Sequence, residues 1–256
     1  MSTSMREILK FSLGPEQAAL WFLGQSGFVV RAAGVTVVID PYLSDSVSKL
    51  VPELTRRYPP PIQPDELRAD VFVVTHNHLD HLDPDTIGPY RHKRETWFVA
   101  PRLAARELHS LGVLPENLAV VDSGITATVR GVEITGVHAI PNDPAAIDTA
   151  GYKITFANGR SVYHSSDTAF SELLLACVPR AEVALVCING KSGNMDPAEA
   201  ARVAVRVEAR IALPHHHDLF ELNAEHPRSL AYQLKYLASN IQAPTPSLMT
   251  PLVWTG

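Results

Sequence analysis

Short hydrophobic runs separated by glycine or proline characterise the first third of the chain. Between Ala18 and Asp40, three runs rich in β-branched and aromatic residues are broken by a pair of glycines and an A-A-G turn, which predicts a three-stranded meander. Proline-rich sequence from Pro52 to Pro64 predicts an irregular loop. The next run, D-V-F-V-V-T-H, is apolar almost throughout and predicts a buried strand that ends at Thr75.

The later sequence continues with shorter strands and, increasingly, helices. T-W-F-V-A and L-A-V-V-D predict strands, and P-R-L-A-A-R-E-L-H-S-L between them predicts a helix with proline in its first turn. Further strands are expected over 125–130, 132–138, 152–156 and 161–164, followed by a helix from about Ala169 to Cys177. The last third alternates V-A-L-V-C-I, a helix opened by Asp196 and Pro197, R-I-A-L-P, and a helix near 227–238. Meanders followed by β/α alternation predict two packed sheets with helices outside.

Composition favours one compact domain over residues 1–256. The 46% of apolar and 19% of charged residues are typical of a globular protein that can bury a sizeable core. A net charge of -5 gives no reason to expect a nucleic-acid partner, because such binding relies on a basic surface. No run approaches 18 apolar residues, and the N-terminal sequence has no apolar stretch before a cleavage site. We therefore expect a cytoplasmic protein without a membrane partner.

The chain has only two cysteines, Cys177 and Cys187. Two thiols can build neither a disulfide framework nor a thiolate metal site. We expect both to be small buried hydrophobic residues in a reducing compartment.

The segment T-H-N-H-L-D-H, from Thr75 to His81, concentrates metal-ligating residues directly after a buried strand. In an extended or turning segment, His76 and His78 point the same way because side chains alternate with a period of two, so both could reach one ion. Asp80 and His81 would then serve a neighbouring ion. The alternative is an exposed histidine-rich turn without metal, although imidazoles so close together repel one another once protonated.

This H-x-H-x-D-H motif resembles that of the metallo-β-lactamase superfamily, and longer phrases resemble its L-ascorbate-6-phosphate lactonase-like branch. The phrases are I-D-P-Y-L-S-D, T-H-N-H-L-D-H-L-D, H-A-I-P-N-D-P, Y-H-S-S-D-T, I-N-G-K-S-G-N-M and P-H-H-H-D-L-F-E-L-N, which span about Trp21 to Asn223. The resemblance implies the α/β class and a four-layer αββα sandwich, with two mixed sheets packed face to face and helices outside. The superfamily motif is highly specific for the fold and poorly specific for the substrate.

The resemblance also implies the later ligands, and each has a candidate in the expected order. His138 ends the strand V-E-I-T-G-V-H, Asp167 follows in V-Y-H-S-S-D-T, and His216 comes two residues after Pro214. By position, the first ion would take His76, His78 and His138, the second would take Asp80, His81 and His216, and Asp167 would bridge them.

Two divalent metal ions, manganese or zinc, are implied by members of this branch. The ligand set agrees, because imidazole and carboxylate without thiolate suit zinc, manganese or iron and argue against soft copper sites. The oxygen-reducing di-iron relatives carry an acid at the position of His78, so the resemblance disfavours redox chemistry.

Several positions keep more than one interpretation. His215 and His217 flank His216, and either could be the ligand in its place. His164 is expected to be a strand residue or to support a ligand rather than to bind metal. Asp40 could orient a ligand imidazole through its free N–H, or it could simply initiate a turn.

Polar residues after two of the strands are candidates for contact with a substrate. The loop that contains Asn189 and Lys191 follows a buried strand, and its two glycines would let backbone amides approach a ligand. Lys191 could contact an anion, although a lysine in such a loop is usually just solvated. Asn142 and Asp143 could line the pocket or merely start a turn.

These features predict a metal-dependent hydrolase that acts on a small molecule. A metal-bound hydroxide would attack a carbonyl carbon or a phosphorus, with Asp80 and Asp167 as the expected catalytic residues. The branch resemblance puts first the opening of a lactone or the cleavage of an ester of a small metabolite, phosphorylated or not. The alternatives are a metal-dependent phosphodiesterase and, in another class, a non-catalytic metal-bound binding protein. The resemblance also suggests a homo-oligomer.

Overall fold

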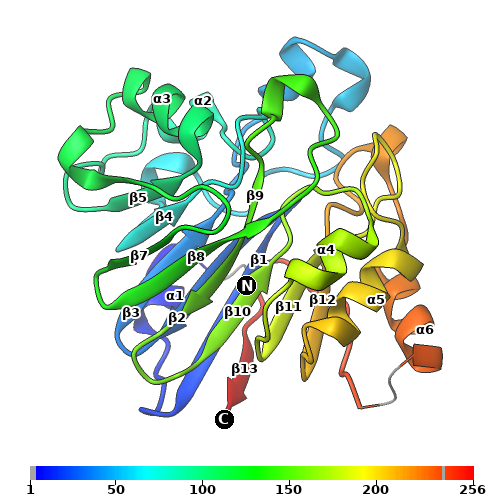
Figure 1. The fold of residues 1–256 in the computed structure, drawn as a ribbon. Helices are drawn as coiled ribbons and strands as arrows, with labels where there is room; N and C mark the ends of the chain where they lie inside the picture. Colours follow the sequence, from blue (N-terminus) through cyan, green and yellow to red (C-terminus); the bar gives the residue numbers. More distant parts are fainter. Residues whose placement is uncertain (1–3, 238–239) are drawn as a thin grey trace.

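A computed structural model describes residues 4–237 and 240–256 and arranges them around two sheets (Figure 1). The seven-stranded sheet has the order β13-β1-β2-β3-β4-β5-β6, with β1 Gln17–Gly24, β2 Gly27–Ala32, β3 Val35–Ile39, β4 Val71–Val73, β5 Trp97–Ala100, β6 Leu118–Val120 and β13 Leu252–Thr255. The six-stranded sheet has the order β12-β11-β10-β9-β8-β7, with β7 Thr126–Val129, β8 Val132–His138, β9 Ala150–Thr155, β10 Ser161–His164, β11 Val183–Cys187 and β12 Ile211–His215.

Both sheets are mixed, and in each an antiparallel part joins a parallel part. The strands β1, β2 and β3 form the expected antiparallel meander, and β4, β5 and β6 then add in parallel. In the other sheet β7 to β10 are antiparallel, whereas β10, β11 and β12 run parallel. Each change follows the sequence pattern, because short turns connect the meanders and longer segments connect the parallel strands.

Helices cover the outer face of each sheet and complete the four layers. α1 Met5–Lys10, α2 Pro84–Ile87 and α3 Arg102–Ser110 pack on the seven-stranded sheet, and α4 Glu172–Cys177, α5 Pro197–Arg206 and α6 Arg228–Leu237 pack on the six-stranded sheet. A third apolar cluster fills the space between the sheets. The predicted αββα sandwich with two mixed sheets is therefore confirmed.

Strand β1 shows why the sequence of these strands is apolar almost without interruption. Leu20 and Phe22 enter the cluster between the sheets, while Trp21 and Leu23 enter the cluster under the helices. Successive side chains of a strand point to opposite faces, so a strand covered on both sides needs an apolar residue at nearly every position.

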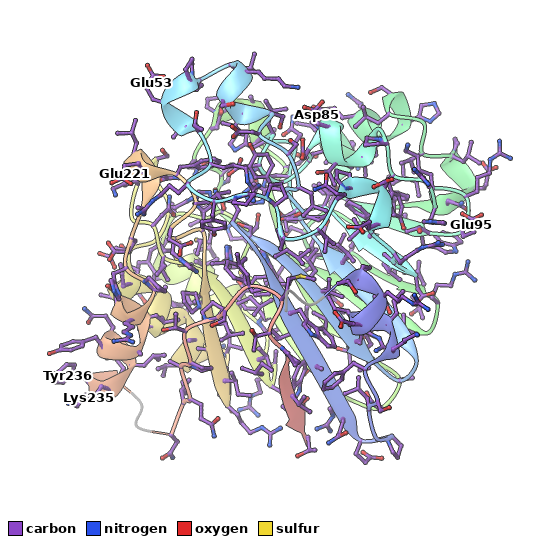
Figure 2. The ribbon with its side chains drawn as sticks, turned by 180° about the vertical axis from the view of Figure 1, so that it is seen from behind. Glu53, Asp85, Glu95, Glu221, Lys235 and Tyr236 are labelled. Atoms are coloured by element: carbon purple, nitrogen blue, oxygen red, sulfur yellow. The ribbon has the colours of Figure 1, made fainter. Side chains whose placement is uncertain are left out.

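The loops that leave β4, β10 and β12 carry the predicted ligands except His138, which ends β8, and Asp40 follows β3. They are accompanied by the 3₁₀ turns η1 Val47–Lys49, η2 Pro52–Leu54, η5 Pro144–Ala146 and η6 Glu221–Asn223, and η2 contacts η6. Two further 3₁₀ turns are η3 Pro64–Glu66 and η4 Pro115–Asn117. In Figure 2, Glu53 and Glu221 lie toward the same end of the molecule, whereas Tyr236 and Lys235 lie lower down.

The structure corrects two expectations and adds two elements. α4 starts at Glu172 rather than near Ala169, because Ser171 caps it from an extended conformation. Cys177 is exposed, so only Cys187 fits the expectation of a buried thiol. α1 and β13 were not expected. The last residue expected in the final helix, Ala238, lies outside the described residues, and none of the described helices is long and apolar enough to cross a membrane.

Candidate metal centre

A buried aspartate at the end of β3 fixes the turn that carries the predicted ligands. Asp40 Oδ1 accepts a hydrogen bond from Thr75 N at 2.8 Å, and Oδ2 accepts one from Thr75 Oγ1 at 2.6 Å. The same Oδ2 lies 2.7 Å from Nδ1 of His81, and both side chains are completely buried. This contact leaves Nε2 of His81 facing away from Asp40, toward the acidic side chains of the cluster.

Two overlapping groups of side chains could each hold a cation. The first consists of His76, His81 and Asp167, the second of Asp80, His81 and His216, and in each the ligating atoms lie within 4.8 Å of one another. His81 Nε2 and Asp167 Oδ1 are 3.3 Å apart, yet both are buried without a hydrogen bond. Buried polar atoms are normally paired, so this orphaned nitrogen and oxygen fit the place of a divalent cation.

Burial and neighbouring charge set the protonation of the histidines. Burial, followed by repulsion from His81, lowers the pKa of His76 to about 3, so this imidazole is neutral and offers a lone pair. Burial also opposes the charged form of His81, but Asp167, Asp80 and Asp40 raise the pKa of His81 well above its usual value. For His216, burial is likewise outweighed by Asp167 and Asp80, which raise its pKa to about 9.

The carboxylates of the cluster are held in their charged form. Burial favours the neutral acid, yet His216 and His81 keep the pKa of Asp167 well below its ordinary value. Burial is again overcome at Asp80, where His81 and His216 lower the pKa. The negative potential that draws protons to these two histidines would equally attract a divalent cation, which is the larger charge.

Three amide side chains that the sequence analysis missed hold the ligand candidates in place. Gln25 Nε2 donates to Asp80 Oδ2 at 2.8 Å, and Asn194 Nδ2 donates to Asp167 Oδ2 at 2.8 Å. Asn223 Nδ2 lies 3.3 Å from His216 Nδ1. Gln25 was hidden in a turn between two glycines, whereas Asn194 and Asn223 lie within the phrases that carried the resemblance.

Several of these residues adopt a backbone conformation that non-glycine residues rarely adopt. Gln25, Asp40, Ser166 and His216 have φ angles of 52°, 40°, 60° and 55°. Such conformations cost on the order of 1–3 kcal/mol each and concentrate at functional sites. The backbone of His216 is further fixed by a hydrogen bond of 2.8 Å from its N–H to Gln25 O.

The two remaining candidates for the first ion are placed differently. His78 Nδ1 lies 3.0 Å from His76 Nε2, and its own Nε2 lies 3.1 Å from Asp143 Oδ2, so His78 adjoins the first group. His138 is half-buried at the end of β8, beside Ala150, whose N–H bonds to the carbonyl of Thr75. It lies near the turn, but neither of the two groups includes it.

The three consecutive histidines point in three directions. His216 places Nε2 3.2 Å from Asp167 Oδ2 and 3.3 Å from Asp80 Oδ2. His215 contacts Ser26 Oγ through Nδ1 at 3.0 Å and stacks on His164, which lies beneath the cluster. His217 stacks on Phe22, with 5.4 Å between the ring centroids. Of these three histidines, His216 is the one that the geometry favours as the ligand.

A pocket of about 570 Å³ opens directly above the cluster and is lined by His78, Asp80, Asp167 and His216 among others. Asn142 and Asp143 also line it, and Asn142 donates to Asn194 Oδ1 at 2.6 Å. Asn189 is buried and instead donates to Asn223 Oδ1 at 2.7 Å. Lys191 donates to the carbonyl of Ala224 at 2.6 Å and is not among the lining residues.

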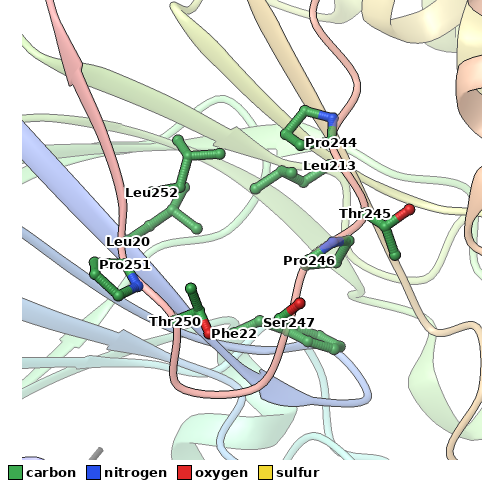
Figure 3. A pocket seen from close by; sticks show the side chains of 10 residues that line it. All are labelled: Leu20, Phe22, Leu213, Pro244, Thr245, Pro246, Ser247, Thr250, Pro251 and Leu252. Carbon is green, nitrogen blue, oxygen red and sulfur yellow. The ribbon is translucent and has the colours of Figure 1, made fainter.

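A second cavity lies away from this centre, between the C-terminal segment and the strands β1 and β12. It measures about 200 Å³, and Leu20, Phe22, Leu213 and Leu252 give it an apolar lining (Figure 3). None of the charged residues described above reaches it. The described residues of this second cavity therefore offer no charged side chain for catalysis.

Comparison with known proteins identifies the family of this centre. The profile described as "Beta-lactamase superfamily domain" matches residues 35–217, a range that includes all the ligand candidates above. The chain belongs to the metallo-β-lactamase superfamily. Among its superfamily relatives, a UPF0173 metal-dependent hydrolase of Methanopyrus kandleri is 30% identical over 231 residues, which are 86% of this chain and 93% of the relative.

Another relative and a solved structure resemble the chain over most of its length. A UPF0173 metal-dependent hydrolase of Methanosarcina mazei is 28% identical over 218 residues, 80% of this chain and 86% of the relative. The solved structure of a metallo hydrolase from Ignicoccus hospitalis matches with a TM-score of 0.73 and 20% identity, covering 94% of this chain and 99% of that chain. The structural match shows that the fold is shared.

Proposed function

We propose that this protein is a metal-dependent hydrolase that opens a lactone or cleaves an ester of a small metabolite, with manganese or zinc as its metal. The supporting observation is the orphaned pair of His81 Nε2 and Asp167 Oδ1, buried at the floor of an open pocket. A cation held there would have protein ligands below and an open side toward a substrate, as in catalytic metal sites. The relatives named metal-dependent hydrolase and the lactonase-like phrases support the same class of reaction.

The residues of the cluster would bind the metal and keep it in place. His76, His81, Asp80, Asp167 and His216 would hold the metal. When bound, a divalent cation supplies activation of water and polarisation of the carbonyl group. Amide and carboxylate side chains around the ligands keep those ligands in one orientation. The atom of each such ligand that faces the metal therefore has a fixed direction.

Asp80 is the group best placed to move a proton. It lines the pocket, and Gln25 Nε2 fixes one of its oxygens. In the hydrolysis, the oxygen of a water molecule forms a bond to the carbonyl carbon, and the bond from that carbon to the alkoxy oxygen breaks. A proton of the water passes through the carboxylate of Asp80 to the alkoxy oxygen, so the products are a carboxylic acid and an alcohol.

Turnover by stripped protein reloaded with manganese or zinc tests the proposal. We expect hydrolysis of a small lactone to exceed that of bis-p-nitrophenyl phosphate, and Asp80→Asn to lower lactone turnover by about 10²–10⁴-fold. Asp85→Asn, at a half-buried aspartate that pairs with Lys49, is the control and should leave turnover unchanged. Faster cleavage of the phosphodiester would favour the phosphodiesterase, and no turnover of either compound would favour the non-catalytic binding protein.

A further inference from the structure

The lining of the pocket above the metal centre combines two kinds of side chain. The amides of Asn142, Asn194 and Asn223 line it. Val47, Leu54 and Phe220 also line it, and these three residues are called the apolar wall. A substrate that reaches the centre therefore meets both polar groups and apolar surface.

The apolar wall is part of a packed cluster of side chains rather than a single exposed residue. Val47 and Phe220 belong to a buried cluster with Tyr42 and Leu219, against which Leu54 packs. The rings of Tyr42 and Phe220 meet edge to face at 6.0 Å between centroids, which fixes the position of Phe220. This wall can bind an apolar group without rearranging.

Exposed apolar residues occur in the segments that supply this wall. Leu50 and Val51 connect η1 with η2 and are 74% and 42% exposed, and Leu222 in η6 is 61% exposed. η2 contacts both η1 and η6, and these three turns or their flanking residues supply Val47, Leu54 and Phe220. Exposed large hydrophobic residues in segments that line a pocket favour a ligand with an apolar part.

The second feature of the pocket is its lack of lysine and arginine side chains. None of the described residues that line it is a lysine or an arginine, whereas Asp80, Asp143 and Asp167 are carboxylates. A phosphate or carboxylate on the substrate, away from the reacting bond, would therefore find no lysine or arginine partner there. It would also face the carboxylate of Asp143, which repels anions.

The basic side chains next to the lining residues in the sequence make other contacts. Arg56 donates from Nη1 to the carbonyl of Tyr42 at 2.7 Å and from Nε to that of Tyr58 at 3.1 Å, while its Nη2 is buried without a hydrogen bond; Arg56 does not line the pocket. Arg57 pairs with Glu221 at 3.1 Å. Lys191 binds a backbone carbonyl. Recruiting Arg57 or Lys191 to an anion would break an existing contact.

We infer that the substrate carries no anionic group beyond the reacting bond and bears an alkyl or aryl substituent that packs on Val47, Leu54 and Phe220. The substrate class is thus an uncharged ester or lactone with an apolar side rather than a phosphorylated metabolite. The inference rests on the proposed hydrolase function and narrows its substrate.

Binding measurements test this inference without relying on turnover. Hydroxamates chelate a metal through their head group and leave the chain free to lie on the wall. Calorimetry on the metal-loaded protein compares acetohydroxamate, octanohydroxamate and suberic acid monohydroxamate, in which a carboxylate replaces the terminal methyl group of octanohydroxamate. We expect octanohydroxamate to bind roughly tenfold or more tightly than acetohydroxamate, and the carboxylate-ended probe to lose that gain.

Leu54 offers variants with opposite expected effects, because it is half-buried and lies at the edge of the wall. Leu54→Ala should reduce the preference for the octyl chain, whereas Leu54→Lys should improve binding of the carboxylate-ended probe by roughly tenfold relative to octanohydroxamate. Leu173, which is 62% exposed on α4, is the matched control. Leu173→Ala and Leu173→Lys should leave all three affinities unchanged.

Two results would overturn the inference: equal affinity for the short and long chains, or tighter binding of the carboxylate-ended probe by the unmodified protein. A different result bears on the proposed function alone. If the chain-length preference stands but the metal-loaded protein hydrolyses no lactone or ester, the pocket is as inferred and the hydrolase proposal is wrong.

Discussion

At the residue scale, the centre depends on side chains whose orientation is fixed by hydrogen bonds to neighbouring residues. Asp40 is the clearest case, since it is buried, has a φ of 40° and uses both carboxylate oxygens on the turn that carries the ligands. Burial favours its neutral form, yet His81 lowers the pKa of Asp40, so the carboxylate stays charged against the imidazole. A group placed in this way controls which nitrogen of His81 is free to bind metal.

Replacing Asp40 should therefore weaken metal binding although Asp40 is not itself a ligand. We expect Asp40→Asn to lower metal affinity by about 10–100-fold, because the amide cannot accept hydrogen bonds at both of its ends. Competition with a chromophoric chelator measures the affinity. Asp70→Asn is the control, since Asp70 accepts a hydrogen bond from Thr36 N in a remote turn. Equal affinities in both variants would show that Asp40 does not orient the ligand.

Single residues also show which parts of the site could be predicted from the sequence. The turn from Thr75 to His81 could be recognised because histidine and aspartate are uncommon in such density after a buried strand. Gln25 could not, because an amide in a turn between two glycines looks like ordinary loop sequence. Its role depends on β1 and β12 meeting in space, which no local pattern reveals.

At the element scale, strand ends decide where the chemistry lies. β3 ends before Asp40, β10 ends shortly before Asp167, and β12 ends at His215. The strands themselves were predictable because burial on both faces demands apolar runs. β13 and α1 were not, because β13 is buried at only Trp254 and α1 has just six residues, too few for a clear helical period.

A substitution in β8 can test how closely this strand packs against the loop before β7. A Cβ added to Gly136 would lie 2.2 Å from the carbonyl oxygen of Asp122, which is backbone and cannot swing aside. We expect Gly136→Ala to lower the free energy of unfolding by about 1–3 kcal/mol or more, measured by urea titration. Gly14→Ala, where a Cβ would meet the flexible side chain of Gln17, should change it little. Similar stabilities of the two variants would mean that β8 can shift away from the loop.

At the scale of the whole molecule, the centre exists only because two sheets pack together. The seven-stranded sheet supplies Asp40 and the turn with His76, Asp80 and His81, and the six-stranded sheet supplies Asp167 and His216. The overall fold could be predicted from the motif and its resemblance, and the same resemblance named the residues that meet in the two groups, although His138 belongs to neither. The polarity of the pocket could not, because Val47, Leu54 and Phe220 come from loops that converge only in the folded chain.

Metal content is the most direct measurement of the central claim, that this convergence binds divalent cations. Elemental analysis of protein purified without added metal should find stoichiometric manganese, zinc or a related metal. His81→Ala should lose most of it because His81 belongs to both groups, and His76→Ala should lose part of it. The exposed His226 provides the control, since His226→Ala should keep the full content, and circular dichroism should show that all variants are folded. Metal-free wild-type protein, or unchanged content in folded His81→Ala, would contradict the claim.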